Sequence, residues 1–535
     1  MTADWTSWAS ERPSLTPAAQ ALLTEELGSL TPRRATALSD AKVPPSRLSP
    51  HLQARLAAAA GAEAVKVDDA SRARHAGGQA YLDLVRRRHG DASAAPDAVV
   101  VPRDAATVQQ VVEICSNERI AIVPWGGGTS VVGGLDPVLG TASAVVAIDL
   151  AQLNGLVRVD ETSMLATFGP GVRTPAAEAL LEPFGLTLGH VPQSFERATL
   201  GGYVVTRSAG QASTGVGRID DLVAGLRMST PSGELVLLPQ AGSAAGPDLR
   251  RLVLGSEGTL GIVTEVTLRV HRRPQHRHYE GWMLRDWQTG LELLRRIAQE
   301  GPRPDITRLS DPKETEVSFT MSRSGGLMRS ALGRYLRLRR VQEGCLLITG
   351  YEGSEADVGY RRDKVRALLR DVHAVSLGKP AGQAWEHSRF AAPALRDTLL
   401  DAGALAETLE TAATWTRLPY VYDAVRAALQ STLGRAVVGC HVSHLYSSGA
   451  SLYFTVLASA QGDGEIEQWS AAKAAVNDAI VAAGGTITHH HAVGTAHREH
   501  VTADLGGDLG VAMLRAVKAA VDPNNVMNPG KLLPT

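Results

Sequence analysis

The sequence predicts an α+β protein with more than one domain. Its 535 residues are more than one ordinary hydrophobic core organises, so two or three domains are expected. The first 95 residues have the pattern of helices joined by irregular segments, whereas from Ala98 onward short apolar runs alternate with helical patterns. A second alternation begins after residue 275. We therefore divide the chain into an N-terminal helical region (1–95), a first α+β domain (96–275), a second one (276–480) and a C-terminal segment (481–535) that returns to the first domain.

The composition excludes several classes of protein. The formal net charge is -1 and no long Lys/Arg run occurs, which argues against binding to nucleic acid. Cys115, Cys345 and Cys440 are far apart, so neither a disulfide framework nor a thiolate zinc site is expected. The first residues lack a secretory pattern, and no apolar stretch approaches the roughly 20 residues that span a bilayer. We expect a cytoplasmic protein without a transmembrane segment.

The elements of the 96–275 region can be predicted in order. AVVVP is a short strand, and Asp104 is a good N-cap for the helical pattern that follows. IAIVPW and AVVAIDL are buried strands, and TPAAEALLEPFG is a helix that ends at Gly185. LVAGLRMSTPSGELVLL is a hairpin that turns at Pro231-Ser232-Gly233. Residues 192–218 are rich in Gly, Ser and Thr, and this composition predicts a long loop.

Glycine-rich segments are the strongest local feature. WGGGTSVVGG (125–134) follows a buried strand, where glycine lets backbone N–H groups approach an anion closely. Taken alone, the segment also fits a tight turn. It is neither a dinucleotide G-x-G-x-x-G nor a P-loop. Two further loops, TLGGYVVTRSAG (199–210) and GSEGTLGIVTE (255–265), favour a site for a diphosphate and a polar ring edge.

These three motifs, in this order, resemble the FAD domain of the vanillyl-alcohol-oxidase/p-cresol-methylhydroxylase superfamily. The resemblance implies a two-subdomain FAD-binding fold over 96–275 and an α+β cap domain for the substrate over 276–480. It also implies that the first loop wraps the FAD diphosphate and that the other two meet the diphosphate, the flavin and the adenosine. In some members a His after the glycine triplet binds FAD covalently. Thr129 stands at that place here, so non-covalent FAD is expected.

The resemblance assigns the cofactor contacts to four segments. They are Pro124, Trp125, Gly126, Gly127, Gly128, Thr129 and Ser130; Gln193, Ser194 and Thr199; Gly202, Val205, Thr206, Arg207 and Ser208; and Glu257, Gly258, Thr259, Leu260, Gly261, Ile262 and Val263.

A second unusual feature is the run His489-His490-His491 in TITHHHAVG. On a strand, His489 and His491 would share one face and His490 would lie on the other. The run also fits a surface histidine patch or part of a metal site. A metal site would need one or two further ligands, and no spacing to another histidine is convincing. We therefore predict no metal.

The histidine run resembles a His-His-His-Gly-Val-Gly segment in the active site of the alkylglycerone-phosphate synthase branch of the superfamily. By the same resemblance Tyr446 is the catalytic acid/base, Arg308 is an active-site arginine and Arg396 binds substrate. The implied reaction exchanges the acyl group of acyl-dihydroxyacetone phosphate for a fatty alcohol through a flavin N5 adduct. The implied partners are a small-molecule or lipid-like substrate, peripheral membrane contact and a second copy in a homodimer, without nucleic acid.

Departures from this branch keep alternatives open. Ala492 and Thr495 replace a Gly and a Lys of the synthase motif, and the tail NPGKLLP is more like that of 2-hydroxyacid dehydrogenases. The alternative is an FAD-dependent 2-hydroxyacid (lactate/glycolate-type) oxidoreductase, but its metal-holding His-x-Gly-Asp-Gly-Asn and Glu-His-Gly segments are replaced here. A flavin-binding protein without catalysis is a third hypothesis, against which Tyr446 and the histidines argue.

Overall fold

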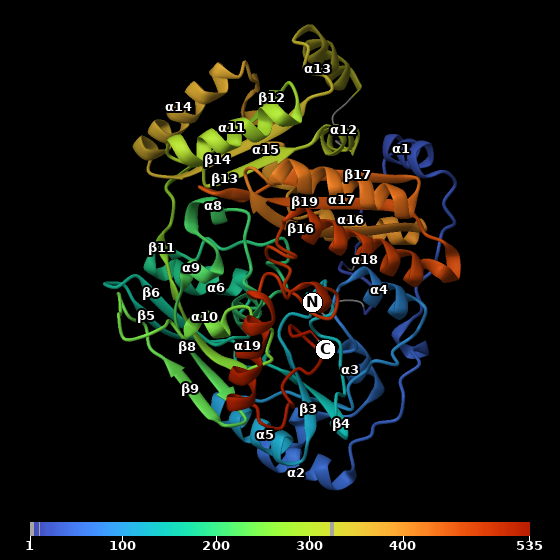
Figure 1. Ribbon diagram of the computed structural model, residues 1–535, viewed down its shortest axis with the longest axis vertical. Helices are drawn as coiled ribbons and strands as arrows, with labels where there is room; N and C mark the ends of the chain where they lie inside the picture. Colours follow the sequence, from blue (N-terminus) through green and yellow to red (C-terminus); the bar gives the residue numbers. More distant parts are fainter. Residues whose placement is uncertain (1–4, 10, 322–325, 535) are drawn as a thin grey trace. The chain divides into compact units, whose positions relative to one another are not determined.

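A computed structural model describes residues 5–9, 11–321 and 326–534, and the chain forms two compact units (Figure 1). Unit 1 consists of Met1–Arg34, Gln211–Val216 and Arg273–His489. Unit 2 consists of Ala35–Gly210, Gly217–Arg272 and His490–Thr535. Each unit combines helices with sheets, which confirms the predicted α+β class.

Unit 2 contains a four-stranded sheet in the order β1-β2-β4-β3. The strands are β1 (Val65–Lys66), β2 (Ala98–Val100), β4 (Ala144–Asp149) and β3 (Ile120–Trp125). β2 and β3 both run parallel to β4. The residues from Ile120 to Val123 are all buried, as expected for a strand covered on both faces.

The C-terminal tail covers the free edge of β3. Ile122 donates its N–H to the carbonyl of Val526 at 2.8 Å, and Asn528 donates to the carbonyl of Ile122 at 2.8 Å. The tail is held by Asp522, whose carboxylate accepts the N–H of Val526 and of Met527. The strand that leads into the glycine-rich loop is therefore completed by the last part of the chain.

Unit 2 also contains a five-stranded sheet in the order β5-β6-β10-β8-β9, all antiparallel. The strands are β5 (Leu156–Asp160), β6 (Leu165–Phe168), β10 (Ile262–Arg269), β8 (Val223–Thr230) and β9 (Gly233–Leu237), and β7 (Leu186–Thr187) pairs separately with β11 (His271–Arg272). Thr230 pairs with Gly233, which confirms the predicted hairpin.

The helices of unit 2 follow their sequence signals. Asp104 caps α5, accepting the N–H of Thr107 at 2.8 Å, and Val108, Val111 and Cys115 of this helix are buried at helical spacing. The helices are α2 (Pro50–Ala60), α3 (Asp69–Arg74), α4 (Tyr81–Arg88), α5 (Ala105–Asn117), α6 (Thr174–Leu181), α7 (Leu200–Thr206), α9 (Ile219–Leu222), α10 (Arg250–Val253) and α19 (Gly507–Val521). The helical turn after α6 ends at the predicted Gly185, which has the left-handed conformation.

Unit 1 is built on one eight-stranded antiparallel sheet (Figure 1). The order is β15-β12-β14-β13-β17-β19-β16, and β18 pairs with β19. The strands are β12 (His276–Leu284), β13 (Ile306–Ser310), β14 (Cys345–Gly353), β15 (Val375–Leu377), β16 (Ala404–Thr414), β17 (Ala436–Val442), β18 (Leu445–Tyr446) and β19 (Gly449–Ser459). The longest pairing joins β16 to β19 over all eleven residues of each strand.

The helices of unit 1 contact this sheet, and α18 packs mainly against α17. They are α1 (Pro17–Leu27), α8 (Ser213–Val216), α11 (Trp287–Glu300), α12 (Pro312–Met321), α13 (Gly326–Leu338), α14 (Glu355–Asp371), α15 (Gly378–Ser388), α16 (Ala392–Asp401), α17 (Leu418–Leu433) and α18 (Glu465–Ala483). A bilayer could not be crossed by any helix within the described ranges, because none is both long and apolar enough.

Two details of the prediction need correction. Residues 192–218 are not a continuous loop, because α7 forms within them once Thr199 caps its first turn. The histidine run is not part of a strand: residues 489–491 have irregular backbone, and only the bridge between Thr486 and Ala412 resembles strand pairing. The alternation of faces expected for a strand therefore does not apply to these histidines.

Candidate active site

The glycine-rich loop in unit 2 has backbone N–H groups that can donate to a ligand. It follows β3 directly, and the N–H groups of Gly127, Gly128 and Thr129 donate to no protein acceptor within the described part of the chain. Successive N–H groups of this kind form a nest for an anion. The loop is therefore chemically suited to a diphosphate.

Glycine is required in this loop by close packing. A Cβ on Gly127 would lie 2.1 Å from the carbonyl oxygen of Arg197, and one on Gly126 would lie 2.3 Å from Oγ1 of Thr199. Gly128 also has a φ of +68°, which side chains rarely adopt. The 124–130 and 193–199 segments, both predicted to bind cofactor, therefore lie directly against each other.

The other two predicted cofactor segments join the same cluster. The N–H of Glu257 donates to the carbonyl of Val205 at 2.8 Å. A Cβ on Gly258 would lie 2.7 Å from the ring of Pro124. Ser256 has a buried hydroxyl oxygen without a hydrogen-bond partner among the described residues. Free amides, a spare hydroxyl and close-packed glycines fit a cofactor with a diphosphate, such as FAD.

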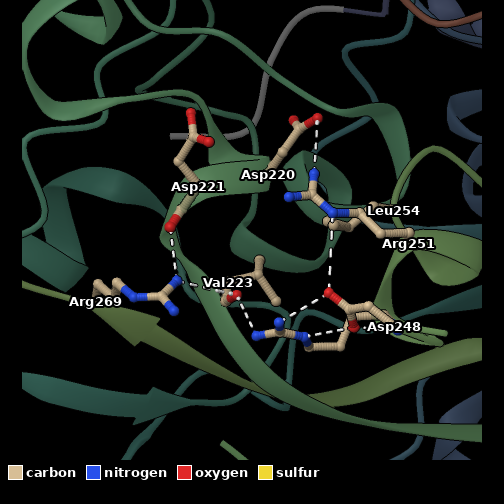
Figure 2. Close-up of a pocket in the computed structure, with 8 residues that line it drawn as sticks. Asp220, Asp221, Val223, Asp248, Arg251, Leu254 and Arg269 are labelled. Atoms are coloured by element: carbon tan, nitrogen blue, oxygen red, sulfur yellow. Dashed lines mark hydrogen bonds and ion pairs between the residues drawn. The ribbon is translucent and has the colours of Figure 1, made fainter. Parts of the chain in front are cut away.

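Arg207, another residue of the predicted cofactor segments, has a guanidinium that is already ion-paired within the protein. Its guanidinium forms an ion pair with Asp220 at 2.6 Å, and its backbone has the left-handed conformation with a φ of 54°. Asp220 lines a neighbouring pocket of about 250 Å³ with three arginines (Figure 2). Arg269 and Arg250 there donate to backbone carbonyls, and Arg251 lies near carboxylates. The charged side chains that line this pocket therefore interact with one another or with backbone carbonyls.

Glu257 fixes the end of the histidine segment, by which we mean residues 486–494 around the three histidines. Its buried carboxylate accepts the N–H of Val493 at 2.8 Å and that of Gly494 at 2.7 Å. Burial raises the pKa of Glu257 to about 7, although the two N–H donors and the charge of Lys531 oppose this shift. The resemblance assigned Glu257 to the cofactor, and the structure gives its side chain this additional contact.

A buried polar network supports the glycine-rich loop from the C-terminal tail. The side-chain amide of Asn528 donates to the carbonyls of Gly134 and Glu257, and Lys531 donates to the carbonyl of Asp136 at 2.8 Å. Burial lowers the pKa of Lys531 to about 8 and raises that of Asp136. The sequence did not predict these residues, because the tail is separated from the loop by almost 400 positions.

His190 is a further residue that the sequence did not predict. It is fully buried, its Nε2 lies 3.1 Å from the hydroxyl of Ser208, and its ring packs edge-on against Tyr203. Ser208 belongs to the predicted cofactor segments. The signal in the sequence was a single histidine just before the second loop, which is weak evidence on its own.

In unit 1 the structure brings Tyr446 and His489 together. The Tyr446 hydroxyl lies 2.5 Å from Nε2 of His489, although 43 residues separate them. Tyr446 is on β18, and its backbone carbonyl accepts a hydrogen bond from the indole of Trp415. The ring of His444 lies 4.8 Å from that of His489. A phenol hydrogen-bonded to an imidazole is suited to proton transfer.

His489 is held in place by Glu410 on β16. The buried Glu410 carboxylate accepts the backbone N–H of His489 and the hydroxyl of Thr488, both at 2.6 Å. Glu410 was not predicted, because nothing in the sequence connects it with the histidine run.

Arg308 lies on β13 in a second polar cluster of unit 1. It donates to Glu314 at 2.5 Å, and Nδ1 of His441 lies 3.1 Å from the other oxygen of Glu314. Burial opposes ionisation of Glu314, but the interactions with His441 and Arg308 outweigh it and lower its pKa to about 2. Burial also lowers the pKa of His441, and the charge of Arg308 acts in the same direction, while Glu314 opposes both. His441 stacks on Tyr453 at 4.9 Å.

The remaining predicted residues lie elsewhere. Arg396 is on α16 and lies next to Asp397, whose carboxylate accepts the N–H groups of Trp8 and Ala9. His490 and His491 belong to unit 2, where their rings lie 4.7 Å apart at 63°. Of the predicted catalytic residues, the structure therefore pairs Tyr446 with His489 directly.

Comparisons with known proteins agree with a cofactor site built from the four predicted segments of unit 2, which we call the cofactor cradle. A family model described as an FAD binding domain matches residues 96–238, and one described as the C-terminal domain of FAD linked oxidases matches residues 273–532. The chain is 33% identical over 484 residues to alkyldihydroxyacetonephosphate synthase of Dictyostelium discoideum, covering 88% of this chain and 79% of that protein.

Solved structures extend the likeness. A structure of alkyldihydroxyacetonephosphate synthase matches with a TM-score of 0.84 and 29% identity, covering 99% of this chain and 98% of the other. The structure of p-cresol methylhydroxylase matches with a TM-score of 0.67 at 15% identity, covering 90% and 96%. The fold is thus that of the predicted FAD-binding superfamily.

Proposed function

The chain belongs to the family of FAD-linked oxidases that includes alkyldihydroxyacetonephosphate synthase, also called alkylglycerone-phosphate synthase, and it is an FAD-dependent enzyme; we propose that it catalyses the synthase reaction. In that reaction the acyl group of acyl-dihydroxyacetone phosphate leaves as a fatty acid and a fatty alcohol takes its place, without net redox change. The alternative, oxidation of a 2-hydroxyacid, is an outcome of the test below.

The observation that carries this proposal is the 2.5 Å contact between Tyr446 and His489. Exchange at C1 of the substrate needs a base to remove a proton and return it. Tyrosine ordinarily titrates near roughly 10, so a neighbouring acceptor for its proton makes it a more effective base near neutral pH. His489 provides such an acceptor through Nε2.

Each residue has a defined task in this mechanism. His489 takes the phenol proton of Tyr446, and the Tyr446 oxygen then takes the proton from C1 of the substrate. The four cofactor segments of unit 2 would hold FAD non-covalently, and the bound flavin would supply an electrophilic site for the carbanion chemistry at C1. We assign binding of the substrate phosphate to Arg308 and Arg396, because arginine binds phosphate through several N–H groups at once.

The arginine assignment has support for Arg308. Its side chain is 29% exposed, and the ion pair with Glu314 uses one of its N–H groups. The guanidinium of Arg308 is therefore held in position, while its other N–H groups can donate to a ligand. His490 and His491 are assigned hydrogen-bonding or proton-shuttling roles.

The test is anaerobic flavin spectroscopy on the purified protein, with palmitoyl-dihydroxyacetone phosphate and with D-lactate or D-glycolate. Flavin bleaching with release of palmitate, and loss of both in Tyr446→Phe, is the expected result. Bleaching by a hydroxyacid with formation of the keto acid would overturn the proposal in favour of the oxidoreductase. Bound FAD that responds to no substrate would indicate a flavin-binding protein without catalysis.

A further inference from the structure

Glu410 is a buried carboxylate close to the candidate catalytic pair. Glu410 is only 3% exposed and lies in the middle of β16. Both carboxylate oxygens accept hydrogen bonds at 2.6 Å from consecutive residues of the histidine segment, namely the Thr488 hydroxyl and the His489 N–H. Charge-assisted hydrogen bonds of this length are among the stronger ones in proteins.

The histidine segment is aligned with β16 over several residues. The N–H of Thr486 donates to the carbonyl of Ala412 at 2.9 Å, and the hydroxyl of Thr411 donates to the carbonyl of Thr486 at 2.5 Å. Together with the Glu410 contacts, these bonds fix the backbone that carries His489. The position of the imidazole relative to β18 therefore depends on β16.

The carboxylate is also near the imidazole itself. An oxygen of Glu410 lies within 4.8 Å of a ring nitrogen of His489, and Nε2 of that ring lies 2.5 Å from the Tyr446 hydroxyl. A negative charge at this distance favours the protonated imidazole. Hydroxyl, imidazole and carboxylate thus occur together, which is the set of groups used when a histidine must take a proton from a hydroxyl.

We propose that Glu410 is a positioning residue for proton transfer between Tyr446 and His489, a role that rests on the proposed function. When His489 takes the Tyr446 proton, the imidazole gains one positive charge and the phenol oxygen keeps the electron pair. The carboxylate of Glu410 stabilises that positive charge without accepting the proton. The Tyr446 oxygen then takes the C1 proton, and both transfers reverse when it is returned.

Other charged groups face this cluster and set its pH response. Lys473 of α18 interacts with Glu410 and with Glu407, and burial lowers the pKa of Lys473 to about 8 despite these two carboxylates. Tyr453 of β19 pairs with Glu410 across the sheet, and burial raises the pKa of Tyr453 to about 12. His444 packs against His489. Lys473, Tyr453 and His444 are unchanged in the variants below.

The first experiment compares Glu410→Gln and Glu410→Asp with the control Glu407→Gln. Glu407 is a buried glutamate on the same strand that also interacts with Lys473, but its carboxylate accepts the N–H of Thr408 rather than the histidine segment. We expect kcat for palmitate release to fall about 100-fold in Glu410→Gln with KM unchanged. We expect the acid limb of the pH–rate profile to move to lower pH, partial rescue in Glu410→Asp, and neither effect in Glu407→Gln.

The second experiment needs no substrate. Phenolate absorbance near 295 nm is titrated in the wild type and in Glu410→Gln, each against the same protein with Tyr446→Phe. We expect the Tyr446 phenolate absorbance at neutral pH to be smaller without Glu410, because the phenolate–imidazolium pair loses the carboxylate that stabilises the imidazolium. This readout stays valid if the substrate proves to be the hydroxyacid and not the acyl ester. Failure of the Glu410 proposal can therefore be distinguished from failure of the proposed function.

Three results would overturn the role of Glu410. One is a folded Glu410→Gln protein, checked by its thermal unfolding, with an unchanged phenolate titration and an unchanged pH–rate profile. Another is an equal kcat loss in Glu407→Gln, which would indicate a general effect of charge removal from β16. The last is inhibition by EDTA that is reversed by added Zn²⁺. In that case the Glu410 carboxylate and the His489 imidazole would be metal ligands.

Discussion

The carboxylate of Glu257 accepts the backbone N–H of Gly494 at 2.7 Å, and this bond connects the turn before β10 to the end of the histidine segment within unit 2. Its second oxygen accepts the N–H of Val493. A carboxylate has acceptor sites on both oxygens, whereas a protonated carboxyl group must place a hydrogen on one of them. The geometry of the segment therefore depends on the ionisation of Glu257.

Substitution of Glu257 by Gln is expected to change how stability depends on pH. Burial raises the pKa of Glu257 from 4.5 to about 7, so between these values the folded protein keeps a proton that the unfolded chain has released. Its stabilising contribution is full below pH 4.5 and is lost as the pH rises through about 7. Relative to Glu257→Gln, the wild type should lose about 3 kcal/mol of unfolding free energy between pH 4.5 and 8.

Chemical denaturation at several pH values measures this difference. The exposed Glu161→Gln variant is the control, since it makes the same side-chain change outside the interior. A difference between Glu257→Gln and wild type that is constant with pH would contradict the prediction.

Gly127→Ala should abolish FAD binding. The added Cβ would lie 2.1 Å from the backbone carbonyl oxygen of Arg197, so two cofactor segments would have to separate. The ratio of flavin to protein absorbance after purification measures the effect. Gly155→Ala is the matched control, because open space surrounds that position; equal flavin content in both variants would count against a cradle built by the loop.

Flavin should be released intact when the protein is denatured with trichloroacetic acid. Thr129 follows the glycine triplet and offers no nucleophilic nitrogen for a covalent link. The absorbance of the supernatant at 450 nm, compared with that of the pellet, distinguishes free from attached flavin. Yellow colour that stays with the precipitated protein would mean that another residue forms a bond.

Glu314→Gln should destabilise the protein by about 2 kcal/mol at pH 7, because Arg308 loses its ion-pair partner in a largely buried cluster. The pKa of Glu314 is lowered to about 2, so its stabilising contribution is present above pH 4.5 and is lost as the pH falls through 2. Urea unfolding at pH 7 and pH 3 should show a smaller difference from wild type at pH 3.

Glu316→Gln is the control for this comparison, because its pairing with Lys313 is on the surface and contributes about 0 to 1 kcal/mol. If both variants lose the same stability at both pH values, the special role of Glu314 is refuted.

Local signals in the sequence accounted for much of the fold and the cofactor cradle. The cap at Asp104, the hairpin at Thr230 and Gly233, and the glycine-rich loop all depend on residues close together in the chain. Glu410 and Glu314 were missed because their partners, His489 and His441, are 79 and 127 positions away. A glutamate that accepts hydrogen bonds from a distant segment has no pattern of its own in a single sequence.

The tail that covers the edge of β3 has a consequence for synthesis on the ribosome. Asn528 reaches Gly134 across 394 positions, which take roughly 20 to 80 s to translate at typical rates. During that interval the nascent polypeptide presents β3 with an unpaired edge, a surface that favours aggregation. A chaperone or early-bound FAD would therefore be most useful before the last segment emerges, and a protein refolded from denaturant, whose tail is present from the start, would avoid that stage.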